Sequence, residues 1–493
     1  MDKLIWAQIF NHSVKHPGSP VPHSSFMDKQ TDTLRKSLLW LLVATSFAFV
    51  VVQLDVTIVN VALPQIGAAL HAGVAGLQWV VDAYTLSFAA LLISAGVIGD
   101  RFGSRRVYLA GFVIFTIASI ICGFAPAIGI LITARAMQGA GAALLVPTSL
   151  AILNHSSEEN PALRARMVAL WTAAGGVSIA AGPVIGGFLL AGFGWRSIFL
   201  VNILLCGIGI YLVLKFVSPD SFKDSLNSET PESRHLDLPG QILGVLALTG
   251  LVGAIIESGH LGFTHPAVLA GFLLGALATA MFIHVERRST SPMLPLQFFR
   301  LPGFNAAVVF GIIVNLTYYG VIFVLSLYLQ QARGYSPLRT GIAFLPLTAT
   351  FIVSNVITGW LTARAGSRFP MILGALIGMV GYALLLRLGE ATSLLSMMAS
   401  FILIPGGMGL AVPAMTTSIL SSVPRERSGT ASAILNTARQ TGGAIGVAVF
   451  GALLGHSRDR IIPGLHISAL ISTGLLLTAA ALAWFGMSRQ SSR

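Results

Sequence analysis

The chain has 493 residues, of which 55% are hydrophobic and only 10% are charged, and its formal net charge is +12. A soluble protein carries about 25% charged residues, so this composition excludes a soluble globular domain and indicates an integral membrane protein. The cations are scattered through short segments between apolar runs, which favours membrane topology over nucleic-acid binding as the reason for the positive charge. Cys122 and Cys206 lie inside apolar runs and indicate no disulfide framework.

Apolar runs long enough to cross a bilayer, about 20 residues each, occur fourteen times along the chain. Each run is predicted to be a helix, because a backbone in lipid must satisfy its own hydrogen bonds. The predicted spans are 38–63, 78–99, 107–125, 128–152, 166–190, 197–217, 240–258, 266–285, 305–330, 338–362, 370–388, 392–420, 430–454 and 465–487. The predicted fold class is therefore an all-α integral membrane protein with 14 transmembrane helices.

Between the second and third spans, the segment 96–106 concentrates three arginines and one aspartate among glycines. Such a segment cannot lie in hydrocarbon, so it is predicted to be a water-facing elbow in which glycine permits a tight turn. The same spacing returns in the second half, with alanine in place of the aspartate, at Gly359, Ala363, Arg364, Gly366 and Arg368. A pattern used at matching places indicates two six-helix bundles related as parallel repeats.

Polar segments divide the chain into seven predicted parts. These are a cytoplasmic N-terminal tail (1–37), an N-terminal six-helix bundle (38–217), a cytoplasmic linker (218–239), an inserted transmembrane hairpin (240–285), a cytoplasmic connection (286–304), a C-terminal six-helix bundle (305–487) and a cytoplasmic tail (488–493). An even number of spans places both termini on one side of the membrane. Most of the 30 lysines and arginines then fall on that side, which predicts that both termini are cytoplasmic.

Four charged residues stand out among those within the predicted spans: Asp55, Asp82, Arg135 and Arg439. A charge inside a bilayer costs about 2.5–3.5 kcal/mol on insertion scales, so each is a functional candidate. Asp55 is interpreted as the carboxylate that takes up and releases a proton, with Arg135 adjusting its proton affinity. The alternative is a static pair that locks the N-terminal bundle. For Asp82, binding of a proton or cation and simple exposure to an outer vestibule both stay open.

Polar side chains within the spans are candidates for substrate contacts. Arg439 either holds an anionic group of the substrate or pairs with a polar neighbour such as Asn436. For the amides and tyrosines, the alternative to lining a cavity is hydrogen bonding between helices. The candidate substrate-binding residues are Gln138, Asn315, Tyr318, Tyr319, Asn436 and Arg439.

The sequence carries no enzyme signature. The eleven histidines lie in tails, loops or span ends, no pair within a span has metal-ligand spacing, and no Ser/His/Asp grouping is evident. The phosphate-binding loop of an ATP-driven pump is also missing. We therefore predict no catalytic residue, metal or cofactor. A secondary transporter is favoured over a channel or receptor, since parallel repeats and a Gly-Pro break in a span suit alternating access.

The order and spacing of several motifs resemble the major facilitator superfamily, specifically its fourteen-span drug:proton antiporter branch. The motifs are LDVTIVNVALP at 54–64, the elbow at 96–106, RAMQGAG at 135–141 and GPVIGG at 182–187. The resemblance implies a proton-coupled exporter of drugs or antibiotics that works by alternating access. It also implies that the elbow latches the two halves on the cytoplasmic face, through Gly96, Asp100, Arg101, Gly103, Arg105 and Arg106.

The GPVIGG segment is predicted to act as a hinge, because glycine and proline bend a helix and small residues allow tight packing. Its residues are Gly182, Pro183, Gly186 and Gly187, and the alternative is packing alone. Family members that export divalent organic cations carry extra acidic residues in the last six spans. No carboxylate lies deep in those spans here, so the resemblance implies that this substrate class is less favoured. The expected partners are a small hydrophobic drug or antibiotic, protons and the lipid bilayer.

The alternative function is a carrier of the same fold for a specific metabolite or siderophore. A monomer is expected, because each half buries its polar face against the other. The motifs and loops are typical of a bacterial protein, which predicts an inner (plasma) membrane location.

Overall fold

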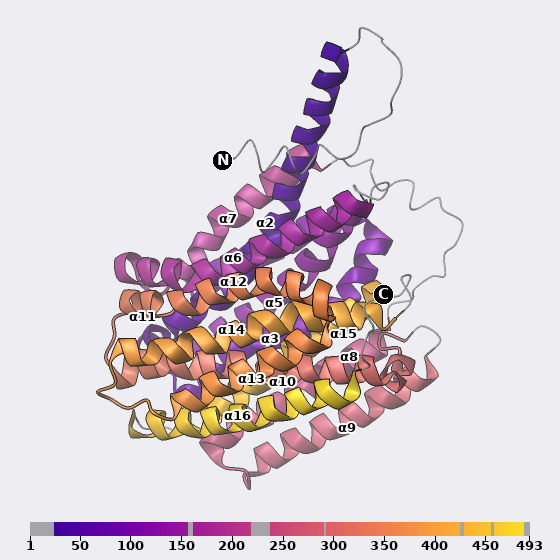
Figure 1. Cartoon of the computed structure of the whole chain (residues 1–493). Helices are drawn as coiled ribbons and strands as arrows, with labels where there is room; N and C mark the ends of the chain where they lie inside the picture. The colour runs from indigo at the N-terminus through magenta and orange to yellow at the C-terminus, as the bar shows by residue number, and fades with distance from the viewer. Residues whose placement is uncertain are drawn as a thin grey trace.

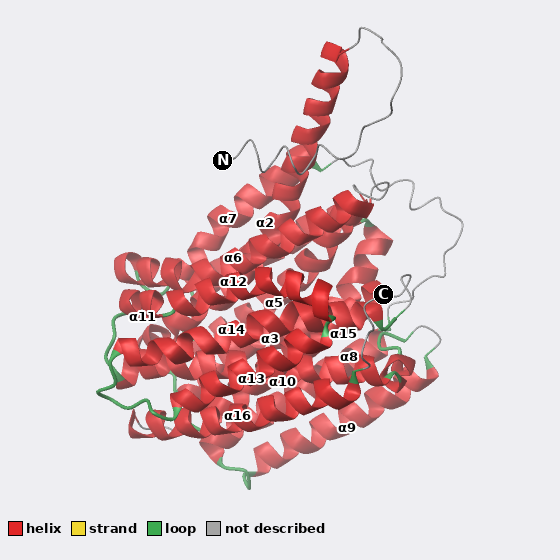
Figure 2. Ribbon diagram, in the orientation of Figure 1, coloured by secondary structure: helices red, strands yellow, loops and turns green. Residues whose placement is uncertain are grey.

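The computed structural model describes residues 24–155, 161–217, 237–289, 292–423, 428–454 and 458–487. Within these ranges the chain forms helices and no strand, as Figure 2 shows. The first six long helices are α2 (Ser24–Leu70), α3 (Val74–Phe102), α4 (Ser104–Gly123), α5 (Ile128–His155), α6 (Pro161–Phe193) and α7 (Ser197–Phe216). The hairpin that follows consists of α8 (Leu238–Leu261) and α9 (Pro266–Arg288).

The second half begins after the short 3-10 helix η3 (Leu296–Arg300). Its helices are α10 (Pro302–Leu327) with the π-helical turn η4 (Tyr328–Ala332), α11 (Pro337–Ala343), α12 (Leu345–Ala365), α13 (Arg368–Leu385), α14 (Leu394–Ser421), α15 (Ser428–Ala452) and α16 (Ile461–Gly486). Proline near the start of α12 explains the break between α11 and α12, because its ring cannot fit inside a continuous helix.

Thirteen segments of the described residues are helices long and apolar enough to cross a membrane, so the chain is a multi-pass membrane protein. The remaining predicted span, 430–454, is the helix α15. Its first half carries Asn436, Arg439 and Gln440, which explains why it is less apolar than the others. The total of fourteen spans therefore stays a prediction.

The predicted boundary of the N-terminal tail differs from the structure, and other predicted segments lie outside the described residues. Helix α2 begins at Ser24, inside the segment predicted as an N-terminal tail. Residues 1–23, 218–236 and 488–493, which include most of the predicted linker and the whole C-terminal tail, lie outside the described residues.

The helices of each half pack mainly on one another. In the first half α3 and α4 pack on α5, and α2 packs on α6 and α7; in the second, α10 packs on α15 and α16, and α14 packs on α12 and α13. Figure 1 shows α6 and α7 toward the top of the view and α16 with α9 at the bottom. A large apolar core joins the halves, since it includes Ile58 and Leu63 from α2 as well as Phe310 and Phe323 from α10.

The halves meet along α3 with α15, α6 with α11 and α12, and α2 with α10. Gln78 donates from α3 to the carbonyl oxygen of Ala448 on α15 at 2.7 Å, and Gln330 donates to the carbonyl oxygen of Val61 at 2.9 Å. Ser326 donates to the carbonyl oxygen of Asn60. These bonds lie toward the end of the bundle where α2 turns into α3, which we call the seal end. The opposite end, with the two elbows, is the elbow end.

Helix α8 touches both halves, because it packs on α3, α15 and α9. Its polar contacts go to α3. Gln241 donates to the carbonyl oxygen of Ala90 at 2.6 Å and accepts from Ser94, and Glu257 accepts from the Trp79 indole at 2.9 Å. Its contact with α15 is a close approach of small residues, as at Gly259 against the α15 backbone. The hydrogen bonds of Gln241 and Glu257 therefore join the hairpin to the first half, and Gly259 packs it against the second.

Candidate functional site

A buried ion pair lies at the centre of the first half. Asp55 on α2 is fully buried, and its Oδ2 accepts a hydrogen bond from Nη1 of Arg135 on α5, which is 1% exposed. The other carboxylate oxygen, Oδ1, accepts from the side-chain amide of Asn202 on α7 at 2.9 Å. Sequence reasoning predicted that the first two residues lie close together. It missed Asn202, although an isolated amide within the apolar run 197–216 is itself a signal.

Further polar groups complete this network. Arg135 also donates through Nε to the carbonyl oxygen of Val80 at 3.0 Å and through Nη1 to Oε1 of Gln138 at 2.9 Å. Gln138 in turn donates to the hydroxyl of Ser119 on α4 at 2.7 Å. Arg135 and Gln138 are three residues apart on α5 and therefore share a face. Gln138, predicted as a substrate contact, thus lies in the network around Asp55.

Glycines on α5 let the neighbouring helices approach this network. A Cβ on Gly139 would collide with the carbonyl oxygen of Tyr84 on α3, and one on Gly141 would stand 2.9 Å from the backbone nitrogen of Phe115 on α4. The RAMQGAG motif therefore combines two polar network residues with the small residues that let three helices converge on them. A charge pair enclosed in this way is costly to disrupt, since removing one partner leaves the other charge buried and uncompensated.

Asp82 does not join this pair. It is fully buried on α3, and neither carboxylate oxygen has a hydrogen-bond partner within the described ranges. The residue one turn before it, Gln78, bonds to α15, and the adjacent Trp79 bonds to α8. Asp82 therefore lies on the side of α3 where these three helices meet, and it is closed off from any vestibule in this conformation.

Arg439 on α15 lies near the contact with α10, where its Cγ would be 3.7 Å from a Cβ on Gly311. Its Nε is buried and has no hydrogen-bond partner in the part of the chain that the structure describes. Tyr319 on α10 packs against α15, 3.1 Å from the position of a Cβ on Gly443, one turn after Arg439. On the first half, the Tyr84 ring lies 4.3 Å from the guanidinium carbon of Arg135. Each of these arginines therefore lies on a helix that a tyrosine of a neighbouring helix contacts.

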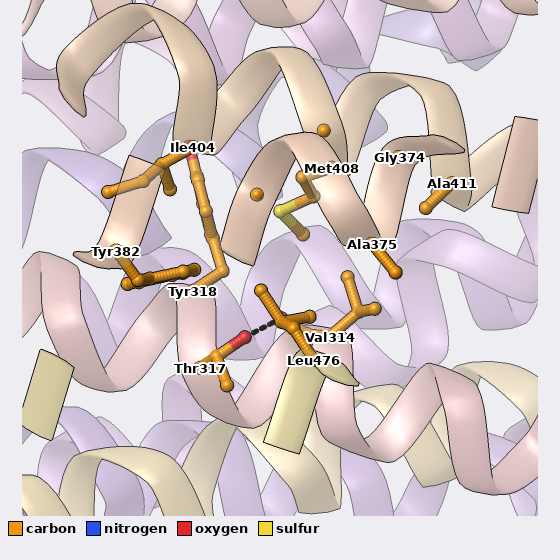
Figure 3. Close-up of a pocket in the computed structure, with 12 residues that line it drawn as sticks. Val314, Thr317, Tyr318, Gly374, Ala375, Tyr382, Ile404, Met408, Ala411 and Leu476 are labelled. Atoms are coloured by element: carbon orange, nitrogen blue, oxygen red, sulfur yellow. Dashed lines mark hydrogen bonds between the residues drawn. The ribbon is translucent and has the colours of Figure 1, made fainter. Parts of the chain in front are cut away.

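The other predicted substrate contacts are dispersed. Asn315 is buried and donates to the carbonyl oxygen of Gly311 on its own helix at 2.8 Å. Tyr318 lines a small cavity inside the second half, together with Thr317, Tyr382 and Met408, as Figure 3 shows. Asn436 is half-buried on α15. Tyr319 and Asn315 therefore lie on α10 near its contact with the helix of Arg439, and the Tyr318 ring, 5.5 Å from that of Tyr319, faces the cavity.

The two elbows share their backbone geometry. Gly103 has φ of +90° and Gly366 has φ of +72°, a region that favours glycine, and each stands between two consecutive helices. In the first elbow Asp100, Arg101 and Arg106 are exposed, Arg105 is half-buried, and a Cβ on Gly99 would approach Thr148 at 2.9 Å. Nothing occupies the space beside Gly96. The gating role stays a prediction.

The GPVIGG segment lies where α6 meets α2 and α11. A Cβ on Gly182 would collide with Thr57, one on Gly186 would stand 2.8 Å from Ile58 Cγ1, and one on Gly187 would stand 2.9 Å from Leu338 Cα. Helix α6 continues through Pro183, whose carbonyl oxygen faces Gly341 on α11. In this conformation the segment provides close packing between the halves, and its action as a hinge stays a prediction.

No group of three or more His, Cys, Asp or Glu side chains with metal-binding geometry occurs among the described residues. The polar groups of the site instead form one satisfied charge pair and two unsatisfied charged side chains within a helical bundle. Charged side chains within membrane helices are candidates for a functional role.

Comparison with known proteins identifies the family. The sequence model of the Major Facilitator Superfamily matches residues 45–447. The chain belongs to this superfamily. In structure the chain is similar to the nucleoside transporter NupG, with a TM-score of 0.63 at 13% identity over 92% of this chain and 100% of that one, a likeness that concerns the fold alone.

Several curated superfamily members are similar over most of their length. Multidrug resistance protein Stp of Mycobacterium tuberculosis is 37% identical over 85% of this chain and 76% of its own. Methylenomycin A resistance protein of Streptomyces coelicolor is 35% identical over 91% and 92%. Puromycin resistance protein pur8 of Streptomyces alboniger is 36% identical over 90% of each chain. The chain is thus a superfamily transporter, related to drug and antibiotic efflux proteins, and not an enzyme.

Proposed function

We propose that this transporter exports small drug or antibiotic molecules and that proton entry drives the export. The observation that carries the proposal is the buried ion pair of Asp55 and Arg135, in a chain whose relatives are named for drug resistance and efflux. A membrane potential contributes about 2.3 kcal/mol per charge per 100 mV, and a pH difference about 1.36 kcal/mol per unit. One proton per cycle therefore suffices to drive considerable accumulation.

In this proposal Asp55 is the coupling carboxylate and Arg135 its counter-charge. While Arg135 and Asn202 hold the carboxylate, Asp55 is ionised. Protonation would weaken the pair and free Arg135, which links the proton to the packing of α2 and α5. Asp82 is the second carboxylate, and we infer that it is protonated in this conformation, because a buried charged carboxylate without a partner is strongly unfavourable.

We further propose that the elbow end faces the cytoplasm and that this conformation is closed toward the outside. Three side chains that bond across the halves, Gln78, Ser326 and Gln330, lie toward the seal end. In this orientation both termini are cytoplasmic. We also propose that the protein is a monomer and that it lies in the inner (plasma) membrane of a bacterium. The exposed arginines of the first elbow then satisfy the preference for positive charge inside.

The alternative is a carrier of the same fold for one metabolite or siderophore. Export of several unrelated toxic compounds supports the drug exporter, whereas movement of a single compound supports the alternative.

The coupling proposal is tested in everted vesicles that contain a pH-sensitive dye. Puromycin, methylenomycin A and unrelated toxic compounds are added to vesicles with wild-type protein or with the Asp55→Asn variant. We expect a compound to dissipate the pH gradient only when Asp55 is intact. Exchange of protons for drug by the variant would refute the assignment of Asp55. Absence of proton movement with every compound in wild type would refute coupling.

A further inference from the structure

Arg439 is a charged group within a membrane helix whose hydrogen-bonding capacity is unused. Its Nε is buried without a partner, and across the residues that the structure describes the guanidinium has no hydrogen bond or ion pair. Arginine offers five N–H donors and no acceptor, and it stays charged. Arg439 is half-buried, so the rest of its guanidinium is open to an added acceptor, which would offset the cost of a lone charge within a span.

Among the described residues, no carboxylate is paired with Arg439. Beyond residue 300 the acidic residues are Glu390, Glu426 and Asp459, and each falls between the long helices. In the first half, Asp55 is already bound by Arg135. Asp82 is not the partner either, because both of its oxygens are unpaired.

The neighbours of Arg439 also offer donors. Tyr319 packs against α15, with its Cδ2 3.1 Å from the position of a Cβ on Gly443, one turn after Arg439. Tyr84 lies on α3, which also packs on α15, and its hydroxyl is buried without a partner among the described residues. A guanidinium without an acceptor, on a helix that packs against tyrosines, forms a donor site that fits a ligand with negatively charged acceptor oxygens.

We propose that Arg439 binds an anionic group, such as a carboxylate, sulfonate or phosphate, on the molecules that this carrier exports. This proposal rests on the proposed exporter function, and it specifies that the exported molecules carry an anionic group. Arginine suits this role because its planar donors match the oxygens of these groups.

The test compares two fluorescent probes with the same aromatic skeleton, anilinonaphthalene sulfonate and neutral phenylnaphthylamine. Binding is measured with full-length protein in lipid nanodiscs, with empty nanodiscs as the blank and without a proton gradient. The variants are Arg439→Gln and Arg439→Lys. Arg387→Gln, the same change at an exposed arginine, is the matched control. Titration with chloride shows whether an inorganic anion competes for the site.

We expect wild type to bind the sulfonate more tightly than the neutral amine. Arg439→Gln should weaken sulfonate binding at least about tenfold, as expected for a lost charged hydrogen bond, and leave amine binding unchanged. Arg439→Lys should keep part of the preference for the sulfonate over the amine, and Arg387→Gln should keep all of it. Retained amine binding shows that a variant is folded.

Equal affinity of wild type for both probes would overturn the proposal. An equal loss of affinity for both probes in Arg439→Gln would overturn it as well. Displacement of the sulfonate by chloride at physiological concentration would assign the site to inorganic anions and also overturn it. None of these outcomes depends on proton movement. Failure here is therefore distinguishable from failure of the coupling experiment with Asp55→Asn.

Discussion

The buried Asp55–Arg135 pair allows a quantitative prediction of how its variants change the free energy of unfolding and the coupling of protons to drug export. Asp55→Asn leaves the buried Arg135 charge without its counter-charge, and Arg135→Gln leaves Asp55 in the same state. Removing one partner of a buried pair costs about 3–5 kcal/mol, whereas replacing both charges is often nearly neutral. The double variant should therefore be more stable than either single one, and the cycle should give an interaction energy of about 3 kcal/mol or more.

The measurement is denaturant-induced unfolding in mixed micelles for wild type, both single variants and the double variant, with Arg387→Gln as the surface control. The same four proteins are then compared for drug-driven proton movement. We expect the double variant to regain stability but not coupling, because the titratable group is gone. A wild-type unfolding midpoint for Asp55→Asn would show that the pair is not charged in the folded state. Proton exchange by the double variant would place coupling elsewhere.

Three further variants test the contact between the halves at the seal end, the protonation of Asp82 and the attachment of the hairpin. Gly187→Ala should loosen the seal end, because its Cβ would meet the α11 backbone at 2.9 Å. An impermeant maleimide should then label a cysteine introduced at position 60 more strongly. The control Gly192→Ala, which lies in open space on the same helix, should not increase this labelling. Asp82→Asn should leave thermal stability unchanged and lower the number of protons moved per drug, whereas marked destabilisation would contradict a protonated Asp82. Gln241→Ala should cost about 1 kcal/mol in unfolding experiments, because it removes the bonds of Gln241 to Ala90 and Ser94 on α3. An unchanged midpoint would show that these two bonds do not stabilise the hairpin.

The fold was largely predictable because a bilayer imposes simple rules on helix length and polarity. Runs of about 20 apolar residues identified the helices, and α15 was found although Arg439 makes it more polar. The extension of α2 back to Ser24 was not predictable in this way, since polar residues outside the lipid carry no apolar signal. The break between α11 and α12 was also missed, although proline near the start of α12 marks it.

The site was predictable in its charges but not in its neighbours. Asp55 and Arg135 are conspicuous, because any charge within a span is unusual. Which amide meets them depends on the rotation of each helix, which hydropathy does not determine. The sequence therefore did not distinguish Gln138, which joins the Asp55 network, from Asn315, which bonds to its own helix. It likewise did not separate the paired Asp55 from the unpaired Asp82.

The embedded charges are unevenly divided between the halves, and the proposals give this division a physical meaning. The acidic groups Asp55 and Asp82 lie in the first half, whereas the second half carries Arg439 and no acid within its long helices. In these proposals, protons bind to the first half and the anionic group of the substrate to the second. Helix α3, which carries Asp82, packs on α15, which carries Arg439, and the two helices belong to opposite halves. A rearrangement of the halves would change this contact, so we expect the two binding events to be coupled through the seam rather than through a shared residue.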